Sequence, residues 1–434
     1  MNRTLVRILV FLSVAASLSA RDLTLEQAMQ MARDHSFAIK KAQAAALGAG
    51  SDLSAARAER LPTLGLAGVA SYTNKTAQMN INIPGLISLQ REVGSKEKYQ
   101  ADFRLNMPLF TGGRITGGID AATASADYYQ ALESATTDQI VYVAHLEYLN
   151  LSRADQVLAA SESARRRTGV IQQNIASLFE AGSADSIALL DARLAVSKAD
   201  QAVDQARTNR RGSEIRMLTL IGLDPSENLT VTDTLPEPQL DPAKGSLSTQ
   251  KAELRAAEAA VRLSQSRIRL AGVEFWPTIS AYGGYSYGKP NLDQFNASWN
   301  DYWTVGANLN WSFNIGGRAA NKSRAARYNF AAAQNDRDLT RENLERDISL
   351  SYEQMKLAYT KYQNSLNQFQ IANDSYRLAK QQHQNGDLAT NRLLEIEADL
   401  SSSESNLAAA KADFFAAQTA YRFALGSDTI TKGK

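Results

Sequence analysis

The sequence predicts a mixed α and β membrane protein with two internal repeats, each giving a β-hairpin and long coiled-coil helices. Three observations lead to this prediction. Gly-Gly-Arg occurs twice, in "LFTGGRITGG" at 109–118 and in "FNIGGRAANK" at 313–322. Proline, which breaks helix interiors, is absent between 108 and 225 and after 290. Apolar and polar residues alternate directly before both motifs, as they do in β-strands.

Composition excludes several kinds of protein. The 434 residues include 47 basic and 45 acidic side chains, so nothing indicates a nucleic-acid partner. Cysteine is absent, which excludes disulfides, a thiolate metal site and a lipidated N-terminal cysteine. The three histidines lie far apart in the sequence. We therefore expect no cofactor and no metal.

Residues 1–20 have the pattern of a cleaved export signal. Arg3 and Arg7 precede the apolar run 8–16, and small residues follow except for Leu18. A buried N-terminal helix is the alternative. No later run reaches the roughly 18 apolar residues that a membrane helix needs. We expect an exported chain without a helical anchor.

The Gly-Gly-Arg pair belongs to a longer internal repeat. Gly112 and Gly316, Gly182 and Gly386, and Gly222 and Gly426 are each 204 positions apart. A repeat of this length predicts two copies of one supersecondary unit. The expected segments are a first repeat at 21–223, a Pro-rich linker at 224–245, a second repeat at 246–426 and a tail at 427–434.

Each repeat should begin with a helix, continue as a β-hairpin and end in two long helices. The hairpins are expected at about 61–110 and 275–314, and the long helices at 114–221 and 317–425. The helices carry heptad rows typical of coiled coils, although an ordinary amphipathic helix is the alternative. The clearest row is Leu393, Leu400, Leu407, Phe414 and Tyr421. The stretch 114–180 alone would span about 100 Å as a helix.

The predicted strands have one apolar and one polar face. In 103–110 and 302–313, Leu105, Met107, Leu309 and Trp311 share the apolar side; Arg104, Asn106, Asn308 and Asn310 share the polar side. All four tryptophans fall in the second hairpin, as in the aromatic girdles of outer-membrane barrels. A sheet packed on a helix is the alternative. Four strands cannot close a barrel, so several chains must contribute to one.

Longer motifs in this order resemble the TolC-type outer membrane efflux protein family. They are "LTLEQAMQMARDHSFAIKKAQAAALGA", "LPTLGL" with "WPTISAYGGYSY", "MPLFTGGR" with "WSFNIGGR", and the segments "FEAGSADSIALLDARLAVSKA" and "QNGDLATNRLLEIEADLSSSESNLAAAKADF". The resemblance covers 23–426. Each motif alone is weakly specific, but their order and doubled spacing are specific.

The resemblance implies a homotrimer with a 12-stranded outer-membrane β-barrel above a periplasmic α-helical tunnel. Such a trimer is the exit duct of a tripartite efflux pump or type I secretion system. Its partners would be outer-membrane lipid, a periplasmic adaptor and an inner-membrane pump. Gly112, Gly113, Gly316 and Gly317 would mark the junction between barrel and tunnel. A periplasmic coiled-coil adaptor or structural rod without its own channel is the alternative function.

The resemblance also implies two groups of functional residues. The adaptor would contact the periplasmic turns at Gly182, Ser183, Gly386 and Asp387. Relatives in the family close the periplasmic end with acidic residues, commonly six and nine positions after the second tip glycine. The ninth position here is Glu395, matched by Asp191 in the first repeat, but the sixth is Arg392. Arg392 could instead pair with Glu395 or Glu397 and leave no acidic ring.

No pattern predicts an enzyme. "TGGRITGG" lacks the glycine spacing of nucleotide-binding loops. Glu395 and Glu397 could be metal ligands, but without His or Cys nearby a solvated helix face is the better interpretation.

Overall fold

The computed structural model describes residues 21–85, 87–240, 243–292, 298–313 and 315–426. The predicted export signal, 1–20, and the predicted tail, 427–434, lie outside the described residues. The chain forms two units. One combines the described residues up to Lys41 with Ser134–Lys251 and the residues from Glu342 onward. The other comprises Ala42–Glu133 and Ala252–Arg341.

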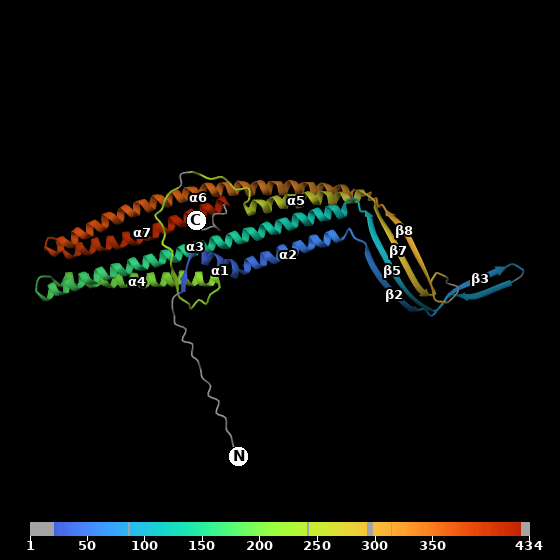
Figure 1. The fold of residues 1–434 in the computed structure, drawn as a ribbon, viewed down its shortest axis with the longest axis horizontal. Coiled ribbons are helices and arrows are strands. Elements are labelled where there is room, and N and C mark those ends of the chain that lie inside the picture. Colours follow the sequence, from blue (N-terminus) through green and yellow to red (C-terminus); the bar gives the residue numbers. More distant parts are fainter. Residues whose placement is uncertain (1–20, 86, 241–242, 293–297, 314, 427–434) are drawn as a thin grey trace, which may run out of the picture. The chain divides into compact units, whose positions relative to one another are not determined.

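The two repeats form long helices of equal length (Figure 1). α3 (Arg114–Glu180) and α6 (Arg318–Gln384) each contain 67 residues, and α4 (Ser186–Ile221) and α7 (Thr390–Leu425) each contain 36. Every boundary in the second repeat lies 204 residues after its counterpart in the first. Within the described residues, no helix combines the length and the apolar character needed to cross a membrane.

The heptad rows form the interior of the helical unit. In α7, Leu393, Leu400 and Phe414 are each at most 3% exposed. Phe414 and Tyr421 pack with Ile348 and Met355 of α6. In α4, buried positions follow the same spacing, including Leu189, Val203 and Met217. The long helices are therefore held by seams of large and small apolar side chains.

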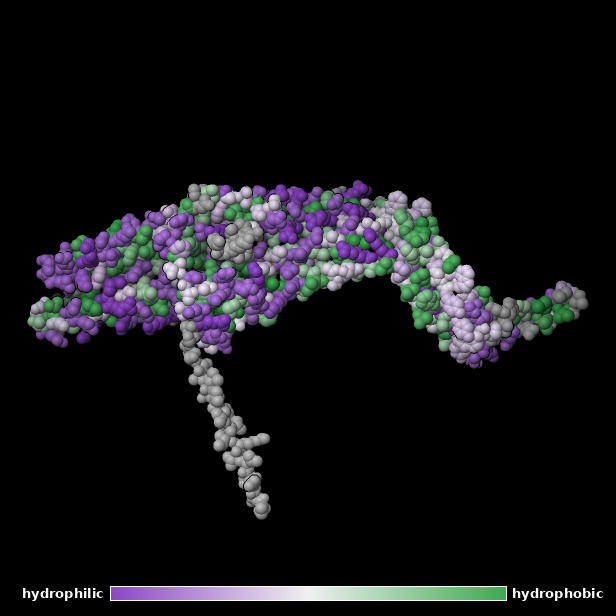
Figure 2. All heavy atoms as spheres, viewed as in Figure 1, coloured by the Kyte–Doolittle hydropathy of each residue, from purple (hydrophilic) through white to green (hydrophobic). Residues whose placement is uncertain are grey.

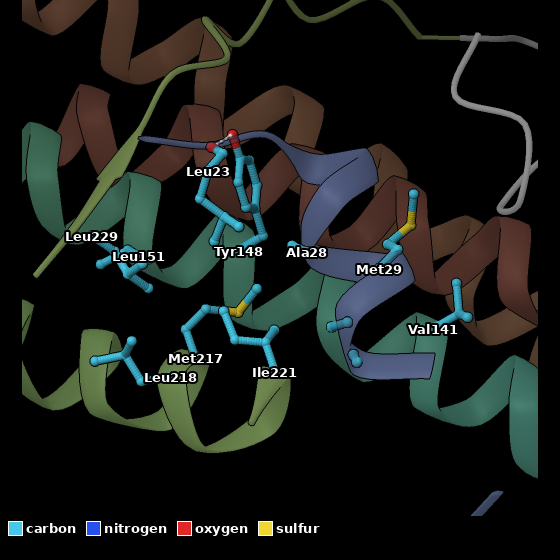
Figure 3. Close-up of a cluster of buried hydrophobic side chains, with 12 residues drawn as sticks. Leu23, Ala28, Met29, Val141, Tyr148, Leu151, Met217, Leu218, Ile221 and Leu229 are labelled. Atoms are coloured by element: carbon cyan, nitrogen blue, oxygen red, sulfur yellow. Dashed lines mark hydrogen bonds between the residues drawn. The ribbon is translucent and has the colours of Figure 1, made fainter. Parts of the chain in front are cut away.

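A second core in this unit joins segments far apart in sequence. It brings together β1 (Arg21–Leu23), α1 (Leu25–His35), β6 (Leu229–Val231), α3 and α4. Figure 3 shows Tyr148 of α3 beside Leu23, with its hydroxyl donating to the Leu23 carbonyl oxygen over 3.2 Å. Leu229 is fully buried in the same cluster.

The prediction that 224–245 is only a linker was therefore wrong. Part of it is β6, which pairs in parallel with β1 from Arg21↔Leu229 to Leu23↔Val231. Backbone polar groups of a segment packed against helices need hydrogen-bond partners, and this ladder supplies them. The strand is three residues long, which is too short for its alternation to be recognised.

The other unit contains α2 residues, α5 and a four-stranded antiparallel sheet. α2 (Phe37–Ala58) and α5 (Ala252–Gly272) lead toward the two hairpins, and a short 3-10 helix, η1 (Val273–Phe275), follows α5. The strands are β2 (Thr63–Tyr72), β5 (Glu97–Phe110), β7 (Thr278–Lys289) and β8 (Asn300–Asn310). Their order is β2-β5-β7-β8, so each repeat contributes a neighbouring pair and β2 and β8 are the edges.

One face of this sheet is apolar and exposed. Leu66, Phe103, Trp303 and Val305 are 83%, 48%, 72% and 73% exposed. Figure 2 shows hydrophobic residues, in green, over the strands. Leu105, Met107 and Leu309 lie on strand positions of this face, whereas Trp311 lies beyond the end of β8. The predicted strand 302–313 was therefore too long at its C-terminal end.

The prediction of a single hairpin at 61–110 was also incomplete. Between β2 and β5 the chain forms a second antiparallel hairpin, β3 (Ala77–Ile83) and β4 (Ile87–Val93). This separate two-stranded sheet accounts for the additional residues of the first repeat. Its alternation was included in the longer predicted hairpin and could not by itself indicate where the pairing changes.

The glycine pairs lie where a strand of the sheet turns into a long helix. Gly112 and Gly113 have φ of +60° and +88°, Gly317 has φ of +69°, and Gly316 lies in the corresponding turn. A Cβ on Gly112 would lie 2.7 Å from Trp276 Cβ. This turn therefore needs glycine both for its backbone angles and for the close approach to Trp276.

Candidate functional site: the helical hairpin tips

The first tip is a five-residue turn between α3 and α4. Gly182 has φ of +76°, its amide donates to the Phe179 carbonyl oxygen over 2.9 Å, and the Ser183 amide donates to that of Leu178 over 2.7 Å. These two bonds form a Schellman motif, which ends a helix at a left-handed glycine. The Asp185 carboxylate then accepts the Ala188 amide over 2.7 Å and caps α4.

The second tip, between α6 and α7, repeats this geometry. Gly386 has φ of +84°, and its amide donates to the His383 carbonyl oxygen over 3.1 Å. The Asp387 amide donates to that of Gln382 over 2.9 Å. The residue that corresponds to Asp185 is Ala389, which provides no side-chain cap. Instead, His383 Nδ1 donates to the Leu388 carbonyl oxygen over 2.8 Å, so a side chain fixes this turn from the preceding helix.

An open cleft of about 970 Å³ lies between the two tips. Ser183, Asp185 and Asp191 line it from the first hairpin, and His383, Gly386 and other residues line it from the second. A buried cluster beneath it, including Ile175, Leu189 and Leu393, joins the two hairpins. The three predicted tip residues other than Asp387 therefore surround one cleft with polar walls and an apolar floor.

The two acidic residues of the expected constriction have different surroundings. Asp191 is half-buried and lines the tip cleft. Glu395 is exposed, and its Oε2 lies 2.9 Å from Arg392 Nη1 on the same helix. The cleft that contains Asp191 is not lined by Glu395. Within one chain Glu395 is thus neutralised by the arginine that occupies the neighbouring family position.

Glu397 is not on a solvated helix face, so that interpretation was wrong. It is 5% exposed and accepts Arg167 Nε over 3.1 Å and the Thr168 hydroxyl over 3.0 Å. Burial raises the pKa of its carboxyl, against the opposing effect of Arg167. Its spacing of four from Leu393 and three from Leu400 could have placed it on the buried seam. The described residues contain no group of three or more metal-ligating side chains.

The chain matches a known family over both repeats. The family is described as "Outer membrane efflux protein", and its model matches residues 28–223 and 246–427. A protein of Salmonella typhimurium described as "Probable outer membrane lipoprotein SilC" is 22% identical over 197 residues. That match covers 44% of this chain and 41% of that protein, so the chain spans less than half of that relative.

Solved structures with the same fold match nearly the whole chain. The Campylobacter jejuni outer membrane channel CmeC has a TM-score of 0.79 at 17% identity, covering 93% of this chain and 85% of that one. The Vibrio cholerae outer membrane protein VceC has 0.77 at 18%, covering 93% and 96%. The open Neisseria gonorrhoeae outer membrane channel MtrE has 0.78 at 16%, covering 94% and 90%. With both repeats matched by one family model, this chain belongs to the outer membrane efflux protein family.

Proposed function

We propose that this chain is the outer-membrane exit channel of a tripartite efflux pump or type I secretion system. Substrates would pass through it from an inner-membrane pump and a periplasmic adaptor to the exterior. The observation that carries this proposal is the sheet β2-β5-β7-β8, which has an exposed apolar face and two edges. A soluble rod has no use for such a face, whereas a membrane barrel needs one.

The proposed assembly is a homotrimer. Unpaired strand edges are not tolerated in lipid, and four strands per chain are too few to enclose a passage. Three copies would pair β8 of one chain with β2 of the next and close 12 strands. The polar face, which carries Arg104, Asn106 and Asn308, would then line the lumen. The long helices that continue from the strands would form the walls of a periplasmic tunnel.

The adaptor is proposed to bind at the tips. The two turns present exposed backbone and polar side chains around an open cleft, and an apolar cluster lies beneath it. A helical hairpin of an adaptor could place apolar side chains in this cleft and donate or accept hydrogen bonds at its rim.

Cell fractionation combined with native mass spectrometry tests this function. We expect the chain in outer-membrane fractions, as a trimer, and expect chemical cross-linking in cells to capture an adaptor and a pump. A monomer released with the periplasmic contents would contradict the channel and favour the coiled-coil rod.

Gly386→Val should impair adaptor binding while leaving the trimer in the membrane. A β-branched residue at φ of +84° costs about 1–3 kcal/mol. A Cβ at this position meets no atom within 4 Å, so the effect comes from the backbone alone. Cross-linking to the adaptor and export of cargo should both fall. Gly169→Val is the control, because Gly169 lies inside α3 with equally open surroundings and no positive φ. Normal export and adaptor cross-linking by Gly386→Val would show that the tip is elsewhere.

The acidic layer should control ion selectivity if Asp191 and Glu395 of three chains meet near one axis. Asp191→Ala combined with Glu395→Ala should then lower cation selectivity and weaken block by divalent cations in single-channel recordings. Arg392→Ala should act in the opposite direction, because it removes the partner 2.9 Å from Glu395. Unchanged selectivity in both variants would mean that this layer does not line the closed end.

A further inference from the structure

The equal repeats allow a contact seen inside one chain to be carried over to a contact between chains. The long helices of the second repeat begin and end 204 residues after those of the first. Each residue of α3 and α4 therefore has a counterpart in α6 and α7. If several copies form a ring of hairpins, the contact from first to second hairpin within a chain has a counterpart from second hairpin to the first hairpin of the next chain.

Within one chain, α3 contacts α7 through charged side chains. Arg153 Nη1 lies 3.2 Å from an Asp413 carboxylate oxygen, and Arg167 lies 3.1 Å from both Glu397 and Glu404. Arg153 and Arg167 are two heptads apart on α3, so this row of α3 is the row that meets α7.

The counterpart row on α6 is apolar. Arg153 corresponds to Leu357 and Arg167 to Ile371, and the same seven-residue spacing continues at Leu350 and Leu378. We call these four residues the α6 stripe. They are 54% to 59% exposed, although they lie on a helix whose Met355 and Tyr362 are buried in the chain's own core. Asn364 occupies the remaining heptad position between Leu357 and Ile371.

We infer that the α6 stripe packs on α4 of a second copy of this chain. This inference rests on the proposed trimer and names the surface that closes it. Glu397 and Asp413 of α7 correspond to Arg193 and Asn209 of α4, so Ile371 should meet Arg193 of the next copy and Leu357 its Asn209. Long polar side chains can cover apolar neighbours with their aliphatic stems.

Exposure near the tips supports this assignment. Leu394 of α7 is half-buried and packs on the cluster that joins the two hairpins of one chain. Its counterpart on α4, Leu190, is 61% exposed. The difference is expected if α7 is covered by a hairpin of its own chain and α4 by a hairpin of another chain. The two kinds of seam then differ in chemistry: the seam within a chain is ion-paired, and the α6 side of the seam between chains is apolar.

Cysteine cross-linking in the assembled protein tests the inference cleanly, because the chain has no cysteine of its own. We expect the pairs Ile371→Cys with Arg193→Cys, and Leu357→Cys with Asn209→Cys, to give covalent trimers with a short bismaleimide. Leu357→Cys with Arg193→Cys is the matched control. It uses the same side chains about 21 Å out of register and should give about tenfold less trimer.

Native mass spectrometry separates this inference from the proposed function. A trimer whose in-register pairs cross-link no better than the control would overturn the inference and leave the channel standing. A monomeric wild-type chain would overturn both. As a second measurement, Ile371→Asp should shift the protein from trimer to monomer, whereas Asn373→Asp, an exposed residue two positions on, should not. Equal trimer for the two aspartate variants would contradict the assigned surface.

Discussion

Replacing Glu214 by alanine should destabilise the helical unit more than any exposed substitution on the same helix. Its side chain is 1% exposed and accepts the Leu229 amide over 2.7 Å. It also lies 3.2 Å from Arg210 and 2.5 Å from Arg211. Although burial opposes ionisation, the Leu229 amide and the two guanidinium groups hold the pKa of this carboxyl below its ordinary value.

The expected loss is about 3–5 kcal/mol, because truncation leaves a buried amide and two cations without their shared acceptor. The thermal midpoint, followed by circular dichroism in detergent, measures it. Asp204→Ala is the control. Its carboxylate is 78% exposed and 3.9 Å from Arg207, so it should change stability by less than about 1 kcal/mol. Equal midpoints for the two variants would show that Glu214 does not hold the segment around β6 on α4.

An arginine at Leu309 should reduce membrane assembly far more than an arginine at Asn308. The two residues are neighbours on β8 and lie on opposite faces of the sheet. Leu309 belongs to the exposed apolar face, where a charge near the middle of the bilayer costs roughly 2–4 kcal/mol. Asn308 belongs to the polar face, where a charge would remain in water.

The amount of trimer recovered from outer-membrane fractions measures this difference. Total chain in whole-cell extracts is the control for expression. Trimer yields that fall equally for Leu309→Arg and Asn308→Arg would contradict the assignment of the apolar face to lipid.

Patterns that are local in sequence predicted the helices, strands and turns well. The turns at Gly182 and Gly386 are visible because glycine interrupts a long proline-free stretch, and the left-handed backbone there explains why glycine is required. Heptad spacing identified Leu393 and Phe414 as interior residues, and both are buried.

Features that depend on distant partners could not be predicted. β6 forms only because β1, over 200 residues away, supplies its ladder. Glu214 and Glu397 resemble surface carboxylates until the arginines around them are known. The Arg392–Glu395 pair was one of two possibilities that the spacing allowed, and only side-chain positions distinguish them.

Electrical recording from the purified protein in a planar lipid bilayer tests the central claim most directly. If copies of this chain enclose a water-filled passage, insertion should produce discrete, uniform conductance steps, each from one trimer. A preparation that inserts as a trimer but leaves the bilayer electrically silent would contradict the claim that the chain forms a channel.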